Sequence, residues 1–115
     1  MSVQVLYQEG FQLRCDGRYR EAKGKLEQAL SMEPGHADAL WQLGLVQGFE
    51  GDFDGSLATL QQVVKAHPNH VNARFDLGMT MMMLGMQEDA CAQFREVMRL
   101  QPGHEKAKQQ LVYCP

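Results

Sequence analysis

The chain has 115 residues, a length typical of one domain, and 44% of them are hydrophobic and 22% charged, as in ordinary globular proteins. Its net charge of −3 does not supply the concentrated positive field that nucleic acids and anionic membranes attract, so we expect neither as a partner. Because no apolar run reaches about 18 residues and Met1–Gly10 lacks a basic stretch followed by an apolar core, we expect no transmembrane helix and no secretion signal.

The chain repeats itself with a period of 34 residues, in copies that span residues 3–36, 37–70 and 71–104. Four columns are identical in all three copies: Gly10, Gly44 and Gly78; Gly17, Gly51 and Gly85; Pro34, Pro68 and Pro102; and His36, His70 and His104. Four columns in fixed phase are not produced by chance, so we interpret the chain as an array of one repeated structural unit.

Each copy predicts two antiparallel helices. In the middle copy, Leu40, Leu43 and Gln47 recur at the spacing of one helical face. Gly51 and Asp52 then provide a helix stop and a helix start, because glycine adopts the left-handed conformation and aspartate caps the next helix. The second helix continues to the proline of each copy. The mid-helix glycines Gly10, Gly44 and Gly78 predict a close approach of the neighbouring helix.

The residues after the third copy begin a fourth one. Ala107, Leu111 and Val112 lie at helical spacing, which predicts a capping helix over residues 105–113 that covers the last repeat.

The middle copy resembles a tetratricopeptide repeat. The resemblance rests on Leu40, Leu43, Gly44, Gly51, Ser56, Leu60, Val63 and Pro68, with matching positions in the other two copies. It implies an all-α fold: a single domain over 1–115, an α-solenoid of three helix-turn-helix repeats with seven helices in a right-handed superhelix. Glu9, Gln47 and Arg74 depart from the family pattern.

In this family the first helix of each repeat lines the concave surface, so the resemblance implies a partner-binding groove there. The groove residues that we expect are Tyr7, Phe11, Asp38, Trp41, Leu45, Phe49, Asn72, Phe75, Met79 and Met82, beside Met83, with Gln8, Gln42 and Asp76 at the fringe. A soluble chain rarely exposes so many aromatic and methionine side chains without using them. The alternative is that some of them, the methionines above all, are core residues.

We therefore expect a protein-binding adaptor or scaffold and no enzyme. Family members that clamp the C-terminal carboxylate of heat-shock chaperones carry lysine, asparagine and arginine on this stripe, where the present chain is mostly apolar. A largely apolar helix or extended segment is the better ligand. Two alternatives stay open: a self-associating structural protein, monomer or weak homodimer, and the interaction region of a longer protein.

No pattern indicates catalysis, a cofactor or a metal. His36, His70 and His104 occupy successive repeats, too far apart to share one ion, and we predict turn and helix-capping roles for them. The three cysteines, Cys15, Cys91 and Cys114, are widely spaced and odd in number, which favours reduced thiols in a cytoplasmic protein.

Overall fold

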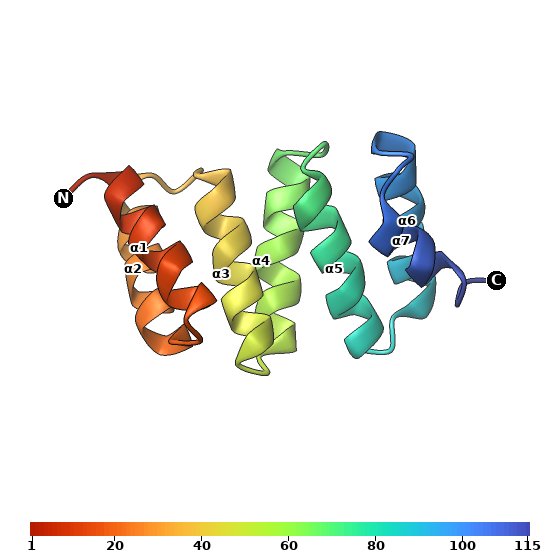
Figure 1. Cartoon of the computed structure of the whole chain (residues 1–115), viewed down its shortest axis with the longest axis horizontal. Coiled ribbons are helices and arrows are strands. Elements are labelled where there is room, and N and C mark those ends of the chain that lie inside the picture. Colours follow the sequence, from red (N-terminus) through yellow and green to blue (C-terminus); the bar gives the residue numbers. More distant parts are fainter. The chain divides into compact units, whose positions relative to one another are not determined.

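The computed structural model describes all 115 residues, and every regular element in it is a helix (Figure 1). The seven helices are α1 (Val3–Cys15), α2 (Tyr19–Met32), α3 (Ala37–Phe49), α4 (Phe53–Ala66), α5 (Val71–Met83), α6 (Gln87–Leu100) and α7 (Glu105–Leu111). This confirms the predicted all-α fold. None of the helices has the length and apolar character needed to cross a bilayer. The contacts within the chain divide it into two compact units, Met1–Thr59 and Leu60–Pro115.

In the first unit, α1 and α2 form a hairpin that α3 covers (Figure 1). Gly17, with φ of 76°, closes α1, and the Arg18 amide donates back to the Leu13 carbonyl at 2.9 Å. The core of this unit contains Ala22, Leu26, Ala39 and Val46, and Tyr7, Leu13, Tyr19, Leu30 and Leu43 pack against it. The predicted stop and start at Gly51 and Asp52 are confirmed: Gly51 has φ of 85°, and the Asp52 carboxylate accepts from the Gly55 amide at 2.9 Å.

The second unit consists of the end of α4 with α5, α6 and α7. Its fully or almost fully buried side chains are Leu60, Val63, Ala73, Leu77, Met81, Ala90, Cys91, Phe94, Val97 and Ala107. The predicted capping segment is helical only as far as Leu111, and the chain then turns towards α6.

The expected close approach is confirmed at Gly10 and Gly78. A Cβ atom built on Gly10 would lie 2.8 Å from the Leu26 side chain of α2, and one on Gly78 would lie 2.6 Å from the Phe94 ring of α6. These are distances that real Cβ contacts do not reach, so in the hairpins α1–α2 and α5–α6 a larger residue at the glycine position would force the facing side chain or the helices to shift.

Helices α3, α5 and α7 begin with a histidine cap. Nδ1 of His36, His70 and His104 accepts a hydrogen bond from the backbone amide three residues later, at 3.0, 3.1 and 3.0 Å. The ring thereby satisfies one of the amides that a helix start leaves without a partner. The predicted capping role of these residues is confirmed.

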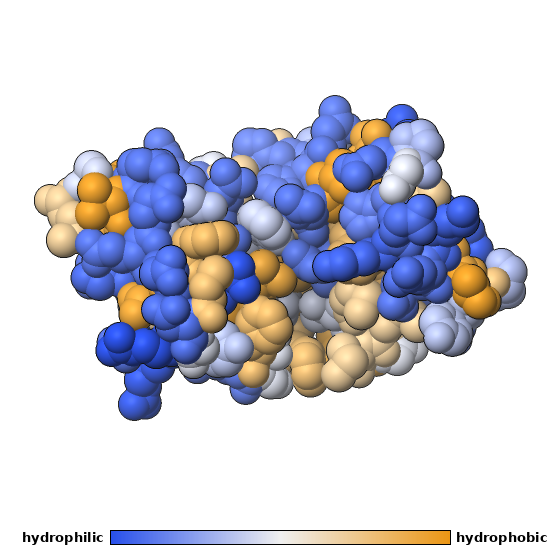
Figure 2. Space-filling view, viewed as in Figure 1, coloured by the Kyte–Doolittle hydropathy of each residue, from blue (hydrophilic) through white to orange (hydrophobic).

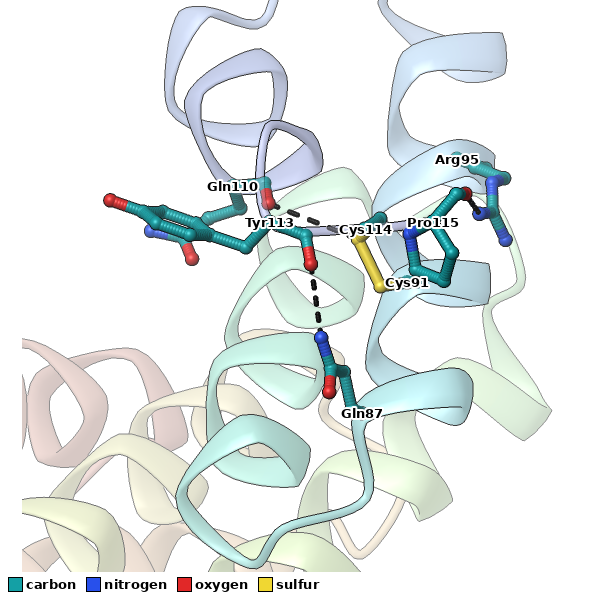
Figure 3. The surroundings of a disulfide bond; sticks show 7 residues. All are labelled: Gln87, Cys91, Arg95, Gln110, Tyr113, Cys114 and Pro115. Carbon is teal, nitrogen blue, oxygen red and sulfur yellow. Dashed lines mark hydrogen bonds between the residues drawn. A yellow bond between two sulfur atoms is a disulfide. The ribbon is translucent and has the colours of Figure 1, made fainter.

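Cys91 and Cys114 form a disulfide, so the expectation of three reduced thiols is wrong for this pair. Cys91 faces the side of α6 over which the chain returns after α7, and this packing brings the two Cα atoms to 5.9 Å although the residues are 23 apart in sequence. Two hydrogen bonds hold the same tail, from Gln87 Nε2 to the Tyr113 carbonyl at 2.9 Å and from Arg95 to the Pro115 carbonyl at 3.1 Å (Figure 3). Cys15 is a free, exposed cysteine.

Candidate partner-binding surface

In the first unit, the stripe expected to bind a partner begins on α1. Tyr7 and Phe11 are half-buried, and their ring centroids lie 6.4 Å apart. The Tyr7 ring also packs on the His36 ring at 5.2 Å. The histidine that caps α3 therefore also supports an aromatic side chain of α1, which restricts the orientations that Tyr7 can adopt.

Burial raises the pKa of the Tyr7 hydroxyl above its usual range, and the carboxylate of Asp38 acts in the same direction. The Arg14 guanidinium has the smaller opposite effect. The phenol is therefore neutral at physiological pH, and it lies in the field of an acidic group from α3 and a basic group from α1.

Arg14 extends the same stripe of α1, three residues after Phe11. Its Nε donates to Oε1 of Gln42 on α3, its guanidinium carbon lies 5.3 Å from the Phe11 ring centroid, and Nη2 approaches the Cys15 sulfur at 3.8 Å. Gln42 is completely buried, which corrects the expectation that it lies at the fringe of the surface. The amide is part of the contact between α1 and α3 and fixes the arginine in place.

Helix α3 supplies the other expected residues of the first unit. Trp41 and Leu45 are half-buried, Asp38 is exposed, and Phe49 is 54% exposed. The Phe49 ring stacks on Tyr19 at 5.3 Å with an interplanar angle of 16°, so it belongs to an aromatic pair at the end of α3.

In the second unit, α5 carries the corresponding residues. Phe75 is half-buried and contacts both the Phe94 ring in the core, at 5.6 Å, and the His104 ring, at 5.1 Å. Asn72 is exposed, and Met79 and Met82 are half-buried. Phe75 therefore has one side in the core and repeats the histidine contact that Tyr7 makes in the first unit.

Apolar and hydrophilic residues are interspersed on the viewed face, where α1 lies in front of α2 (Figures 1 and 2). No group of three or more histidine, cysteine or acidic side chains is placed to hold a metal ion. What the first-helix stripes offer is aromatic and thioether surface with one fixed cation, which suits polypeptide binding.

Arg14 was not among the surface residues expected from the sequence, although the sequence contains a signal for it. Positions 14, 48 and 82 share one phase of the repeat, and Met82 at that phase was expected on the surface. The contact with Gln42 had no such signal, because it depends on the distance between α1 and α3.

Two sequence models of the tetratricopeptide repeat match the chain, one over residues 52–114 and one over residues 16–47. The chain belongs to the tetratricopeptide repeat family. A search of curated proteins finds no match.

Solved tetratricopeptide structures share the fold at low identity. MamA matches with a TM-score of 0.90 and 19% identity over 95% of this chain, which spans 64% of the MamA chain, just under two thirds of its length. The first tetratricopeptide domain of Spaghetti (RPAP3), solved with the HSP90 peptide SRMEEVD, matches at 0.93 and 18% over 96% of this chain and 88% of its own. YrrB, described as having an unusual peptide-binding site, matches at 0.87 and 23% over 95% of this chain and 56% of its own.

Proposed function

We propose that this tetratricopeptide repeat protein is an adaptor that holds a segment of another protein on the first helices of its repeats. The observation that carries the proposal is that the first helices of both units carry partly exposed aromatic side chains: Tyr7 and Phe11 on α1 and Trp41 on α3 in the first unit, and Phe75 on α5 in the second. Aromatic residues are enriched in protein interfaces because they bury a large area at low entropic cost. The RPAP3 domain was solved with a bound peptide, and such modules generally act in protein interaction.

The ligand that we propose is a mostly apolar segment, helical or extended. Methionines beside aromatic rings adapt to irregular apolar shapes. Met79 and Met82 are half-buried and Met83 is 64% exposed, so thioether surface is available on α5. With a short peptide we expect micromolar affinity, about −8 kcal/mol.

A pull-down from native lysate tests the proposal. Wild type is compared with the Trp41→Ala/Phe75→Ala variant by mass spectrometry, and circular dichroism verifies that the variant is folded. Met32→Ala is the matched control, because Met32 is 55% exposed at the end of α2, off the stripe. A protein retained by wild type and by the control but lost by the double variant supports the adaptor function. Identical profiles for all three proteins contradict it.

Self-association is the second candidate. Val112 and Tyr113, which follow α7, are 79% and 66% exposed, and exposed apolar side chains next to the last helix of a repeat array offer a surface to another copy. Light scattering over a concentration series separates the two candidates: a mass that rises with concentration and falls back in a Val112→Ser/Tyr113→Ser variant favours self-association.

No catalytic, cofactor or metal role is part of the proposal. The net charge of −3 supports a protein partner over nucleic acid or an anionic membrane. The expected cytoplasmic location stays a prediction, and the Cys91–Cys114 bond weighs against it because disulfides persist mainly in oxidising compartments. Alkylation of free thiols in protein taken from its native cells tests this. If Cys91 and Cys114 do not react and Cys15 does, the disulfide is present in the cell and the location is oxidising.

A further inference from the structure

The Arg14 guanidinium contacts apolar and neutral groups, and it shares the surroundings of the Tyr7 hydroxyl with the Asp38 carboxylate of α3. Arg14 contacts the Gln42 amide, the Phe11 ring and the Cys15 thiol, and none of these is a carboxylate. The acid nearest to Arg14 in sequence, Asp16, accepts a hydrogen bond from Gln12 at 3.0 Å. Gln12 and Asp16 lie two residues from Arg14, about 200° around the helix, so their pairing is on the opposite side of α1.

Arg14 keeps donors for a ligand. A guanidinium has five N–H groups, and here Nε is used by Gln42 and one Nη2 hydrogen by the weakly accepting sulfur. The side chain is half-buried, so the remaining hydrogens are within reach of solvent. Two parallel N–H groups of this kind match the two oxygens of a carboxylate.

The position of the Arg14 guanidinium is fixed by the Gln42 side chain, whose burial costs folding free energy. Gln42 is 0% exposed, and its Nε2 has no hydrogen-bond partner although it is buried. A buried donor without a partner is destabilising. The side chain is thus held with its oxygen towards Arg14, because only the oxygen can accept from the guanidinium. A fixed arginine loses less entropy on binding than a free one.

We infer that Arg14 recognises an aspartate or glutamate side chain inside the bound segment of a partner protein, next to the apolar residue that contacts Tyr7 and Phe11. This inference rests on the proposed function and specifies its ligand. Tyr7, Phe11 and Arg14 of α1 then bind an apolar residue and an acidic residue that follow in a fixed order along the segment. The acidic group is a side chain within the segment, and not a chain terminus.

Selection from short random peptides tests the inference. The peptides are displayed on phage as fusions through their C-terminal ends, so that no terminal carboxylate is available. The intact chain is the bait, in five forms: wild type, Arg14→Gln, Arg14→Glu, Arg14→Lys and Arg20→Gln. Arg20 is an exposed arginine of α2 and serves as the matched control. Arg14→Lys keeps the charge, and circular dichroism verifies folding of each bait.

The expected result is that wild type and Arg20→Gln select peptides with an acidic residue beside an aliphatic or aromatic one. The Arg14→Gln bait should still select apolar residues but lose the preference for an acidic residue. The Arg14→Lys bait should keep part of the acidic preference, and the Arg14→Glu bait should select peptides with lysine or arginine at the acidic position. For an amidated synthetic peptide of the wild-type consensus, we expect binding to weaken by about 10- to 100-fold on Arg14→Gln, the range of a charge-assisted hydrogen bond.

Two results would overturn the inference, and they differ in what they mean for the adaptor function. If wild type selects apolar peptides with no acidic preference, or if Arg14→Gln binds the consensus peptide as tightly as wild type, Arg14 is only a link between α1 and α3 and the adaptor function stands. If no folded bait enriches any peptide above the Trp41→Ala/Phe75→Ala variant, both the inference and the proposed function fail.

Discussion

At Gly10 and Gly78 the space that a side chain would need is already occupied by Leu26 and Phe94. We expect Gly10→Ala and Gly78→Ala each to lower the free energy of unfolding by about 1–3 kcal/mol, because either the helices or the facing side chain must move. Urea denaturation followed by circular dichroism measures this.

Gly24 is the matched control for these two substitutions. It lies within α2, and nothing is within 4 Å of the position that its Cβ would take. Gly24→Ala should raise the free energy of unfolding by about 0.5–1 kcal/mol through helix propensity alone. If Gly10→Ala is as stable as Gly24→Ala, the close approach is not a constraint.

Tyr7 makes the free energy of unfolding depend on pH in the alkaline range. Burial, with the Asp38 carboxylate, raises the pKa of its hydroxyl in the folded chain. The contribution of this group is therefore complete below the unfolded tyrosine value, about pH 10, and is lost as the pH rises through the folded value. Denaturation midpoints measured between about pH 9 and 11 should fall less steeply for Tyr7→Phe than for wild type. Equal slopes would show that the environment of Tyr7 does not disfavour its phenolate.

At the scale of elements, the histidine caps determine where α3, α5 and α7 begin. His36 both caps α3 and stacks on Tyr7, so one substitution cannot separate the two roles. We compare His36→Asn, which keeps a capping oxygen, with His36→Ala, which does not. Both lose the ring contact, so the difference between them isolates the cap. We expect His36→Ala to be the less stable by about 1 kcal/mol in thermal unfolding. Equal stability would mean that the cap contributes nothing measurable.

The elements themselves could be predicted from the sequence. The 34-residue phase placed a glycine stop at Gly17, Gly51 and Gly85, and all three have positive φ. The same phase placed His36, His70 and His104 at helix starts. Local signals suffice here, because a turn glycine and a capping side chain act within a few residues of the backbone that they control.

The features that sequence could not predict depend on packing between helices. Cys91 and Cys114 meet because the chain after α7 turns back over α6, and two cysteines 23 residues apart do not by themselves indicate a pair. Gln42 was expected at the fringe of the surface and is buried because α1 approaches α3 at Arg14. The neighbouring helices decide which face of the first helix of a repeat is buried. The binding role of the exposed residues on these helices stays a prediction.

At the scale of the whole molecule, the cross-link acts on one unit only. Both cysteines belong to the second unit, whereas Trp41, the single tryptophan, lies in the first. The stability of repeat arrays is approximately a sum of local terms. Reduction of the Cys91–Cys114 disulfide should lower the free energy of unfolding of the second unit by about 3 kcal/mol, because it opens a closed loop of the chain.

Two probes of urea unfolding measure this effect. After reduction, the midpoint from circular dichroism, which reports all helices, should fall below the midpoint from Trp41 fluorescence. Cys114→Ser should reproduce the shift without reductant, and Cys15→Ser should not, because Cys15 is in no disulfide. Coincident midpoints in the reduced protein would show that the chain unfolds as one cooperative block.

The pairing of Cys91 with Cys114 leaves one thiol available to reagents, and that thiol is adjacent to the arginine proposed to read the ligand. A maleimide dye added to the oxidised protein therefore attaches at a single defined place, Cys15, without any engineered mutation. If a segment binds against α1 as proposed, we expect the emission of the dye to change, and the native chain would then carry its own attachment point for an optical sensor of binding.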